Sequence, residues 1–217
     1  MPGRITPLVN NQFYHIFNRG NNKGDIFLQP RDYARFQKTF YYYQYAGPKL
    51  SFSKFSKSNL NSFKPDPNQK LVEIICYCLM PNHFHFLIRQ LKENGISIFI
   101  SQLSNSYTKY FNTKHARVGS LLQGSFKSVL IETEEQLIHV SRYIHLNPVV
   151  SGLVKNLDTY KWSSYLEYIS GHEFLCSPRE ILNLFPSVEK YQEFTEDQID
   201  YGTSLELLKH RTIDINT

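Results

Sequence analysis

One continuous stretch, residues 71–90, limits the fold of this chain more than any other. The segment "LVEIICYCLM" at 71–80 is apolar on both of its faces, which is typical of a central strand. The dipeptide "PN" follows and predicts a turn, and "HFHFLIRQ" at 83–90 alternates as a second strand. We therefore expect an antiparallel hairpin built from these two segments.

The remaining apolar patterns place further elements on either side of this hairpin. They predict strands at 12–20 and 126–133 and helices at 31–46, 95–114 and 134–147. The order strand, helix, strand, strand, helix, strand predicts an α+β fold, a ferredoxin-like (RRM-like) split βαβ with a four-stranded antiparallel sheet and two helices on one face. The last helix opens with a capping box at Thr133 and Gln136, is stopped at Pro148, and is expected on the other face.

Two segments stand apart from this core. Residues 47–70 are rich in serine, lysine, asparagine and proline, which predicts a flexible basic insertion. Residues 171–217 predict a helical C-terminal extension, with a second capping box at Ser177 and Glu180. The expected organisation is therefore one domain over 1–170 followed by the extension.

Composition narrows the classes of protein. The 217 residues carry a net charge of +5, and they include 15 tyrosines and 16 phenylalanines. Cations beside aromatic rings suit nucleic acid, although a mildly basic enzyme has the same balance. The sequence shows no apolar run long enough for a membrane span, no secretory leader at its start, and only three cysteines. These features predict a cytoplasmic protein.

The histidines of "HFHF" are the first candidate site. Strand alternation puts His83 and His85 on one face and Phe84 and Phe86 on the other, so the histidines should project from the face opposite the first two helices. Two imidazoles at this spacing can share a divalent metal ion, but the motif alone favours an exposed or satisfied pair. A His-triad hydrolase would require a third histidine at Leu87, and a two-histidine phosphodiesterase would require His-x-Ser/Thr motifs on two strands. A zinc site with Cys76 and Cys78 is a further alternative to their packing in the core.

The predicted helix 134–147 supplies matching groups. His139, Tyr143 and Asn147 recur at intervals of four and share one helical face, which suggests Asn147 as a third metal ligand beside a reactive Tyr143 hydroxyl. Tyrosine is a suitable nucleophile against a phosphodiester, because a phenolate leaves more readily than an alkoxide and the step can be reversed. Imidazole and amide ligands with an oxygen-rich substrate suit Mg²⁺ or Mn²⁺. Tyr107 and Tyr110 lie on an apolar helical stripe, which favours packing over catalysis.

At these residues the chain resembles a known family. The stretches "YHIFNRGNNKGDIF", "CLMPNHFHFLI", "GSLLQGSFKSVLI" and "YIHLNPVVSGLV…YKWSSYLEY" are similar to the single-tyrosine HUH transposases, particularly the REP-associated tyrosine transposase branch. The resemblance covers about residues 12–170, in the order of the family. It implies metal ligation by His83 and His85, a catalytic Tyr143 and a further polar ligand at Asn147.

The same resemblance implies an activity and a partner. The enzymes of this family cleave single-stranded DNA next to a recognised hairpin, and they leave a 5′-phosphotyrosine and a free 3′-hydroxyl. We therefore expect a metal-dependent single-stranded DNA endonuclease and strand transferase, either monomeric or a homodimer. The rival hypotheses are an HUH replication initiator or relaxase and a non-catalytic nucleic-acid-binding module on an RRM-like sheet.

DNA contacts are predicted from basic residues near the expected site. They lie in the first loop and around the second helix, and they comprise Arg19, Lys23, Lys109, Lys114, Arg117 and Lys127. Cationic side chains of this kind contact phosphates and position a strand without reading its sequence.

Overall fold

The computed structural model describes residues 7–46, 51–58, 64–171, 174–200 and 202. A single antiparallel sheet in the order β2-β3-β1-β4 is formed by β1 (Phe13–Arg19), β2 (Val72–Met80), β3 (His83–Gln90) and β4 (Lys127–Ile131). The helices within these residues include α1 (Pro30–Tyr43), α2 (Phe52–Ser58), α3 (Gly95–Lys114), α4 (Glu134–Val150), α5 (Tyr165–Ser170), α6 (Arg179–Leu182) and α7 (Val188–Glu196). Short 3₁₀ turns lie at 21–23, 67–69 and 157–159.

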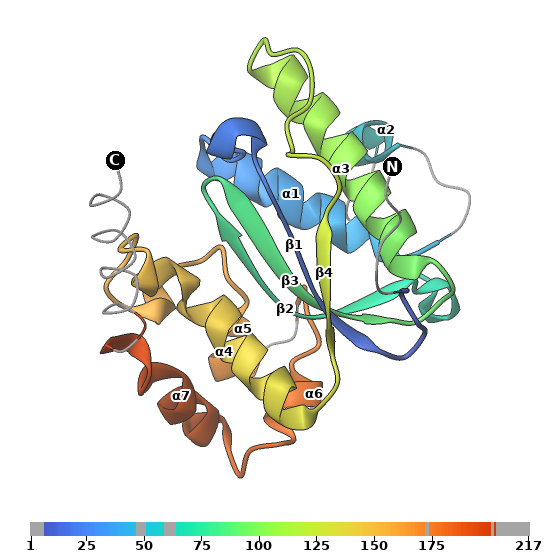
Figure 1. Ribbon diagram of the computed structural model, residues 1–217. Coiled ribbons are helices and arrows are strands. Elements are labelled where there is room, and N and C mark those ends of the chain that lie inside the picture. Colours follow the sequence, from blue (N-terminus) through green and yellow to red (C-terminus); the bar gives the residue numbers. More distant parts are fainter. Residues whose placement is uncertain (1–6, 47–50, 59–63, 172–173, 201, 203–217) are drawn as a thin grey trace.

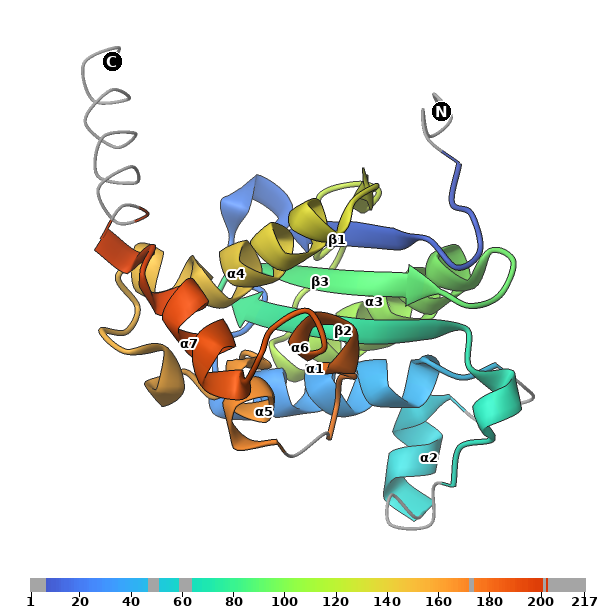
Figure 2. The ribbon, with the colours of Figure 1, turned by 90° about the horizontal axis from the view of Figure 1, so that it is seen from below.

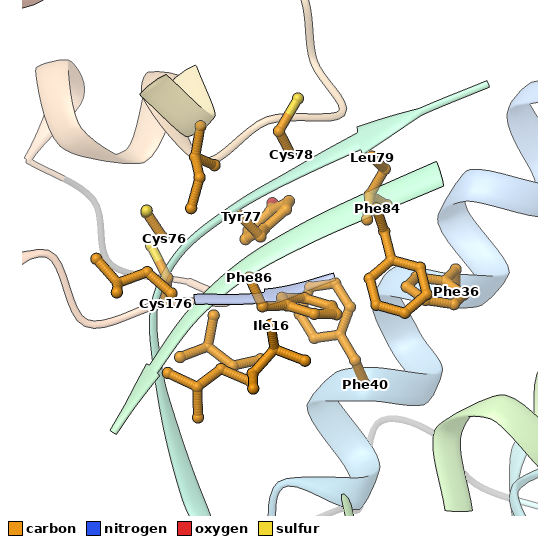
Figure 3. Close-up of a cluster of buried hydrophobic side chains, with 14 of the residues drawn as sticks. Ile16, Phe36, Phe40, Cys76, Tyr77, Cys78, Leu79, Phe84, Phe86 and Cys176 are labelled. Atoms are coloured by element: carbon orange, nitrogen blue, oxygen red, sulfur yellow. The ribbon is translucent and has the colours of Figure 1, made fainter. Parts of the chain in front are cut away.

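One face of the sheet carries the main aromatic core (Figure 3). Phe84 and Phe86 of β3 are fully buried, and they pack against α1 through Phe36 and Phe40, with ring centroids 5.3 Å apart in both pairs. Phe86 also contacts Phe99 of α3. Burial of each such side chain contributes about 1.5–3 kcal/mol, which fixes the orientation of β3 in the sheet. The alternate residues of β3 must therefore point toward the opposite face.

The opposite face is crossed by α4, which packs on β2 and β3 (Figures 1 and 2). Figure 1 shows α1 and α3 on one side of the sheet and α4 and α7 on the other. The expected α+β class with a four-stranded antiparallel sheet is confirmed. Among the described residues, no helix has both the length and the apolar character that crossing a bilayer would require.

The structure adds to the sequence prediction at two places. The helix expected to end at 147 continues to Val150, because Pro148 lacks only its own N–H and therefore interrupts a single backbone hydrogen bond. The predicted flexible insertion at 47–70 contains the helix α2, which lies beside α1 in Figure 2. Phe52 of α2 is 1% exposed and contacts the ring of Tyr42, and this apolar anchor explains the helix. Residues 47–50 and 59–63 of the insertion lie outside the described residues.

The first part of the predicted C-terminal extension packs on the tyrosine-bearing helix. Both α6 and α7 contact α4, and α6 also contacts β2. Tyr191 of α7 is fully buried at this interface. Residues 172–173, 201 and 203–217 of the extension lie outside the described residues.

A buried carboxylate joins α1 to α3. Asp32 is 0% exposed and receives hydrogen bonds from Lys114 (2.6 Å), Tyr110 (3.1 Å) and the backbone N–H groups of Leu28 (3.1 Å) and Gln29 (3.2 Å). Burial alone raises the pKa of Asp32, but the hydrogen bonds from Lys114, Leu28 and Tyr110 outweigh it, and the pKa lies below its usual range. The carboxylate is therefore ionised in the folded protein and holds the two helices of the core face together.

We predict that Asp32→Asn lowers the free energy of unfolding by about 2–4 kcal/mol at pH 7, because charge-assisted bonds in a buried place are lost. A carboxyl group with a lowered folded pKa stabilises the protein above its unfolded pKa of about 3.9 and ceases to do so as the pH falls through the folded value. Urea denaturation at pH 7 and pH 3 should therefore show a smaller difference between the variant and the wild type at pH 3.

The exposed Asp158 provides the control, since Asp158→Asn should change the free energy of unfolding by less than about 0.5 kcal/mol. A difference for Asp32→Asn that is as large at pH 3 as at pH 7 would contradict the proposed charge effect.

Candidate functional site

The two histidines of β3 lie on the face that α4 crosses. His83 pairs with Arg19 of β1 across the sheet, and His85 pairs with Phe17. Their ring centroids are 4.9 Å apart, and the two ring planes are nearly perpendicular. The predicted alternation, with phenylalanines toward the core and histidines on the other face, is confirmed.

Both imidazoles are held in the neutral form. Burial lowers the pKa of His85 well below its ordinary value, and the neighbouring His83 and His15 lower it further. Burial also lowers the pKa of His83, although a side-chain hydrogen bond with Asn147 acts in the opposite direction. Neutral imidazole is the form that binds metal ions, so neither ring requires deprotonation at neutral pH before it can act as a ligand.

The helix α4 brings a tyrosine and an asparagine to these histidines. Thr133 begins the helix by accepting a hydrogen bond from the backbone N–H of Gln136 at 3.1 Å, as its capping box predicts. Tyr143 is 52% exposed, and its ring meets the ring of His85 edge-on at 5.6 Å. Asn147, one turn further on, donates its side-chain N–H to the backbone carbonyl of Tyr143 at 2.8 Å. Its amide oxygen is therefore turned away from that carbonyl.

The other candidates on the helices do not join this cluster. His139, on the predicted face of Tyr143, instead binds Arg142 at 2.7 Å and contacts the ring of Phe194 of α7. Tyr107 is buried in the core, where its hydroxyl donates to the backbone carbonyl of Ile26 at 2.6 Å. The prediction that Tyr107 is a packing residue is confirmed.

His145 has a structural role in the interior of the protein. Its ring is fully buried, with Nδ1 2.8 Å from the hydroxyl oxygen of Tyr191 on α7 and Nε2 2.8 Å from that of Ser164. Ser164 in turn accepts a hydrogen bond from the backbone N–H of Tyr77 in β2 at 2.8 Å. Burial lowers the pKa of His145 to about 3, so the ring is neutral and uses one nitrogen as donor and the other as acceptor. These bonds tie the middle of α4 to the sheet and to α7.

The histidines and Tyr143 line a cavity of about 500 Å³. Its other walls include Arg19, Lys23 and Lys127, and no aspartate or glutamate lines it among the described residues. Three of the predicted DNA-contacting residues therefore lie around the candidate site. This cationic lining suits a polyanionic ligand.

The other three predicted DNA contacts lie elsewhere. Lys109 lines a neighbouring hollow of about 640 Å³ between α3 and the segment before β4. Lys114 is occupied by the buried Asp32 at 2.6 Å, and Arg117 binds Asn112 at 3.2 Å and the backbone carbonyl of Ser120 at 3.3 Å. The structure does not bring Lys114 or Arg117 to the cavity, because each completes a local contact at the end of α3.

A tight loop positions Lys23 at the rim. A Cβ atom on Gly20 would lie 1.9 Å from the backbone oxygen of Gly24, so only glycine permits this close approach. The side-chain N–H of Asn82 donates to the carbonyl of Lys23 at 3.1 Å, and the Asn82 oxygen lies 2.6 Å from Nδ1 of His83. The loop and the first histidine are therefore joined through one asparagine.

His15 belongs to the site but is not among the residues predicted above. It lies on β1, its Nε2 is 2.9 Å from Nδ1 of His85, and its ring meets that of Tyr143 edge-on at 5.8 Å. Burial lowers the pKa of His15 to about 4. Alternation within 12–20 places His15 on the face of Phe17 and Arg19, but only the register of β1 against β3 reveals its histidine partner.

The described residues do not include a group of three or more His, Cys, Asp and Glu side chains arranged to hold a metal ion. Cys76 and Cys78 are fully buried, and burial raises the pKa of both thiols. Their predicted packing in the core is confirmed, and the zinc alternative through these cysteines has no support. Among the described residues, a metal ion held by His83 and His85 would therefore need a further ligand of another type.

The chain is similar in sequence to known transposases. Residues 52–147 match the family model described as IS200-like transposase. Over 104 residues the chain is 29% identical to a candidate REP-associated tyrosine transposase of Haemophilus influenzae, a match that covers 43% of this chain and 58% of that protein. These two findings confirm the predicted resemblance to the REP-associated tyrosine transposases, while the match spans less than two thirds of the relative.

One solved structure has a related fold. A REP-associated tyrosine transposase bound to a REP hairpin has a TM-score of 0.51 and 16% identity, over 82% of this chain and 91% of that one. A candidate transposase from Deinococcus radiodurans reaches a TM-score of 0.37 and 12% identity, over 66% and 95% of the respective chains, which is too low to bear on the fold.

We predict that His145→Phe lowers the free energy of unfolding by about 2–3 kcal/mol, because the hydroxyl groups of Tyr191 and Ser164 lose a buried partner. Chemical denaturation measures this loss, and His139→Phe is the matched control on an exposed position of the same helix. The double variant His145→Phe/Tyr191→Phe should lose less free energy of unfolding than the sum of the losses of the two single variants, because each substitution removes the same hydrogen bond. Strict additivity would contradict the shared hydrogen bond.

Proposed function

We propose that this chain, like the IS200-like transposases it resembles, is an enzyme: a metal-dependent single-stranded DNA endonuclease and strand transferase that uses Tyr143 as its nucleophile. The observation that carries this proposal is the meeting of Tyr143 with His85 and His83 in one cationic cavity. The match of residues 52–147 to the family model supports it. The expected substrate is single-stranded DNA beside a hairpin, since the relative of similar fold is bound to a REP hairpin.

The donor set fits a divalent ion. His83 and His85 are neutral imidazoles that line the same cavity, and a side-chain hydrogen bond links Asn147 to His83. Two imidazoles and an amide oxygen suit Mg²⁺ or Mn²⁺ together with phosphate oxygens. A bound ion of this kind would polarise a non-bridging oxygen of the scissile phosphate.

Tyr143 has the exposure that a nucleophile requires. Its ring is fixed by edge contacts with His85 and His15, while about half of its surface remains open to the cavity and solvent. In the proposed step the phenolic oxygen attacks phosphorus and releases its proton to solvent. The bond between phosphorus and the 3′ oxygen breaks, and that oxygen takes up a proton. The products are a 5′-phosphotyrosine and a free 3′-hydroxyl, and attack by a 3′-hydroxyl reverses the step.

The basic rim would hold the strand during this reaction. Arg19, Lys23 and Lys127 surround the histidines, and their charges suit the phosphates on either side of the scissile bond. Arg19 is oriented by a hydrogen bond from its Nε to the side-chain oxygen of Gln123. Lys109 would contact the DNA farther from the scissile bond, in the neighbouring hollow. Lys114 and Arg117 would make no DNA contact at the cavity.

One copy of the chain contains all the proposed groups. Tyr143 of α4 meets the histidines of β3 within the same molecule, so the geometry does not require a second copy to complete the site. We therefore propose that a monomer is competent for cleavage, and that any homodimer would serve another purpose.

We predict that wild-type protein, incubated with labelled single-stranded hairpin oligonucleotides and Mn²⁺ or Mg²⁺, forms a protein–DNA adduct that survives denaturation. Tyr143→Phe should abolish the adduct, because the attacking oxygen is removed. Chelation of the metal, or the double variant His83→Ala/His85→Ala, should reduce it by at least about 100-fold. Denaturing gel electrophoresis of the labelled DNA measures each outcome.

Tyr110→Phe is the matched control, since this half-buried tyrosine of α3 lies outside the cavity and should leave the adduct in place. An adduct that persists in Tyr143→Phe, or that is indifferent to chelator, would refute the proposed mechanism. DNA binding without any adduct over a broad library of hairpins would favour the non-catalytic module instead.

We also predict that Lys127→Ala weakens binding of single-stranded DNA and lowers the dependence of log Kd on log salt concentration by about 0.7, the loss of one phosphate contact. Lys92→Ala, beyond the opposite end of β3, should leave the slope unchanged. Fluorescence anisotropy at several salt concentrations distinguishes the two. An equal effect of both substitutions would indicate that general charge, and not the cavity, governs binding.

A further inference from the structure

His15 and His85 form a direct pair. The two rings are stacked with centroids 5.1 Å apart and an interplanar angle of 25°. The distance from Nε2 of His15 to Nδ1 of His85 is 2.9 Å, the length of a normal hydrogen bond. A histidine that the chain places against a proposed metal ligand requires an explanation beyond packing.

The strand register produces this contact. His15 of β1 lies directly opposite Leu87, so His85 is its diagonal neighbour on the same face. Phe17 lies opposite His85 and contacts both rings, with centroids 5.0 Å from His15 and 5.9 Å from His85. The pair is therefore held in place by β1 on one side and by the edge of the Tyr143 ring on another.

His15 does not act as a third metal ligand in this arrangement. Its Nε2 is used by His85, and the described residues hold no three such side chains that converge on one point. The contact with His15 occupies Nδ1 of His85, so Nε2 is the ring nitrogen of His85 that could bind a metal ion.

A similar contact occupies Nδ1 of His83. Its Nδ1 lies 2.6 Å from the side-chain oxygen of Asn82, and the N–H of that amide is committed to the carbonyl of Lys23. An amide oxygen accepts and cannot donate, so Nδ1 of His83 donates to Asn82, and in the neutral ring the lone pair lies on Nε2. Asn82 therefore fixes His83 in the form that ligates through Nε2.

We propose that His15 does for His85 what Asn82 does for His83: it accepts a hydrogen bond from Nδ1–H of His85 and so keeps Nε2 of His85 as the metal-binding nitrogen. The reverse bond, with His15 as donor, would put the proton of His85 on Nε2 and block ligation. Metal-binding histidines generally donate their other N–H to a protein acceptor, and loss of that acceptor typically weakens metal affinity by about 10–100-fold. His15 is thus a positioning residue, and this inference rests on the proposed metal-binding role of His83 and His85.

The first test determines which ring nitrogen of His85 carries the proton. Long-range proton–nitrogen correlation spectra of isotope-labelled histidine in the metal-free protein distinguish a protonated from an unprotonated ring nitrogen. We expect His85 to carry its proton on Nδ1, and His15→Phe to shift His85 toward a mixture of the two forms. A His85 ring protonated on Nε2 in the wild type would overturn the inference.

The second test measures Mn²⁺ binding by electron paramagnetic resonance, without DNA and without turnover. His15→Phe should raise the Mn²⁺ dissociation constant by about 10–100-fold. His15→Gln, which keeps an acceptor oxygen, should recover part of that loss. His139→Phe, an exposed histidine bound to Arg142, should match the wild type.

His85→Ala separates the two proposals. One outcome is that His85→Ala loses the Mn²⁺ binding of the wild type while His15→Phe binds as tightly as the wild type. In that case the inference about His15 is wrong, but the metal site stands. If His85→Ala binds Mn²⁺ like the wild type, the metal site of the proposed function itself is wrong, and the inference falls with it. Thermal unfolding of each variant confirms that a changed affinity is measured on folded protein.

Discussion

The imidazole of His145 lies fully buried between α4, β2 and α7, and both of its nitrogens are hydrogen-bonded. An unpaired polar group in such a place is costly, so the ring, Tyr191 and Ser164 must come together as the protein folds. This bonding sets the rotation of α4 about its own axis. Since Tyr143 and Asn147 lie two residues before and two residues after His145, that rotation decides that both reach the histidines of β3.

The sheet separates stability from chemistry. On one face, phenylalanines of β3 pack against α1 and α3, and the buried Asp32 joins those helices. On the other face, the same strand presents His83 and His85 to a cavity with a cationic rim. A rigid, well-packed core behind this face holds His83 and His85 in place, and Asn82 and His15 each contact one ring nitrogen of this pair.

Much of the fold and part of the site could be predicted before the structure was known. The four strands, the helices at 31–46 and 95–114 and the opposite faces of His83 and Phe84 follow from periodicities of two and of three to four residues. α2 was missed because the polar composition of 47–70 hides the single buried anchor Phe52. A charge in a sequence does not show its partner, so only the structure reveals that Lys114 binds Asp32 and that Arg117 binds Asn112 and the backbone of Ser120.

The sequence by itself determined which residues share a strand face or a helix face, because those relations depend only on the local geometry of the backbone. It thereby determined that His83 and His85 point together and that Tyr143 and Asn147 lie one turn apart. Only the tertiary structure decided that His15 bonds to His85, that His139 turns to α7, and that Tyr143 meets the histidines at all. These relations join segments that are far apart in the chain, and they depend on strand register and on the packing of α4, which no local pattern encodes.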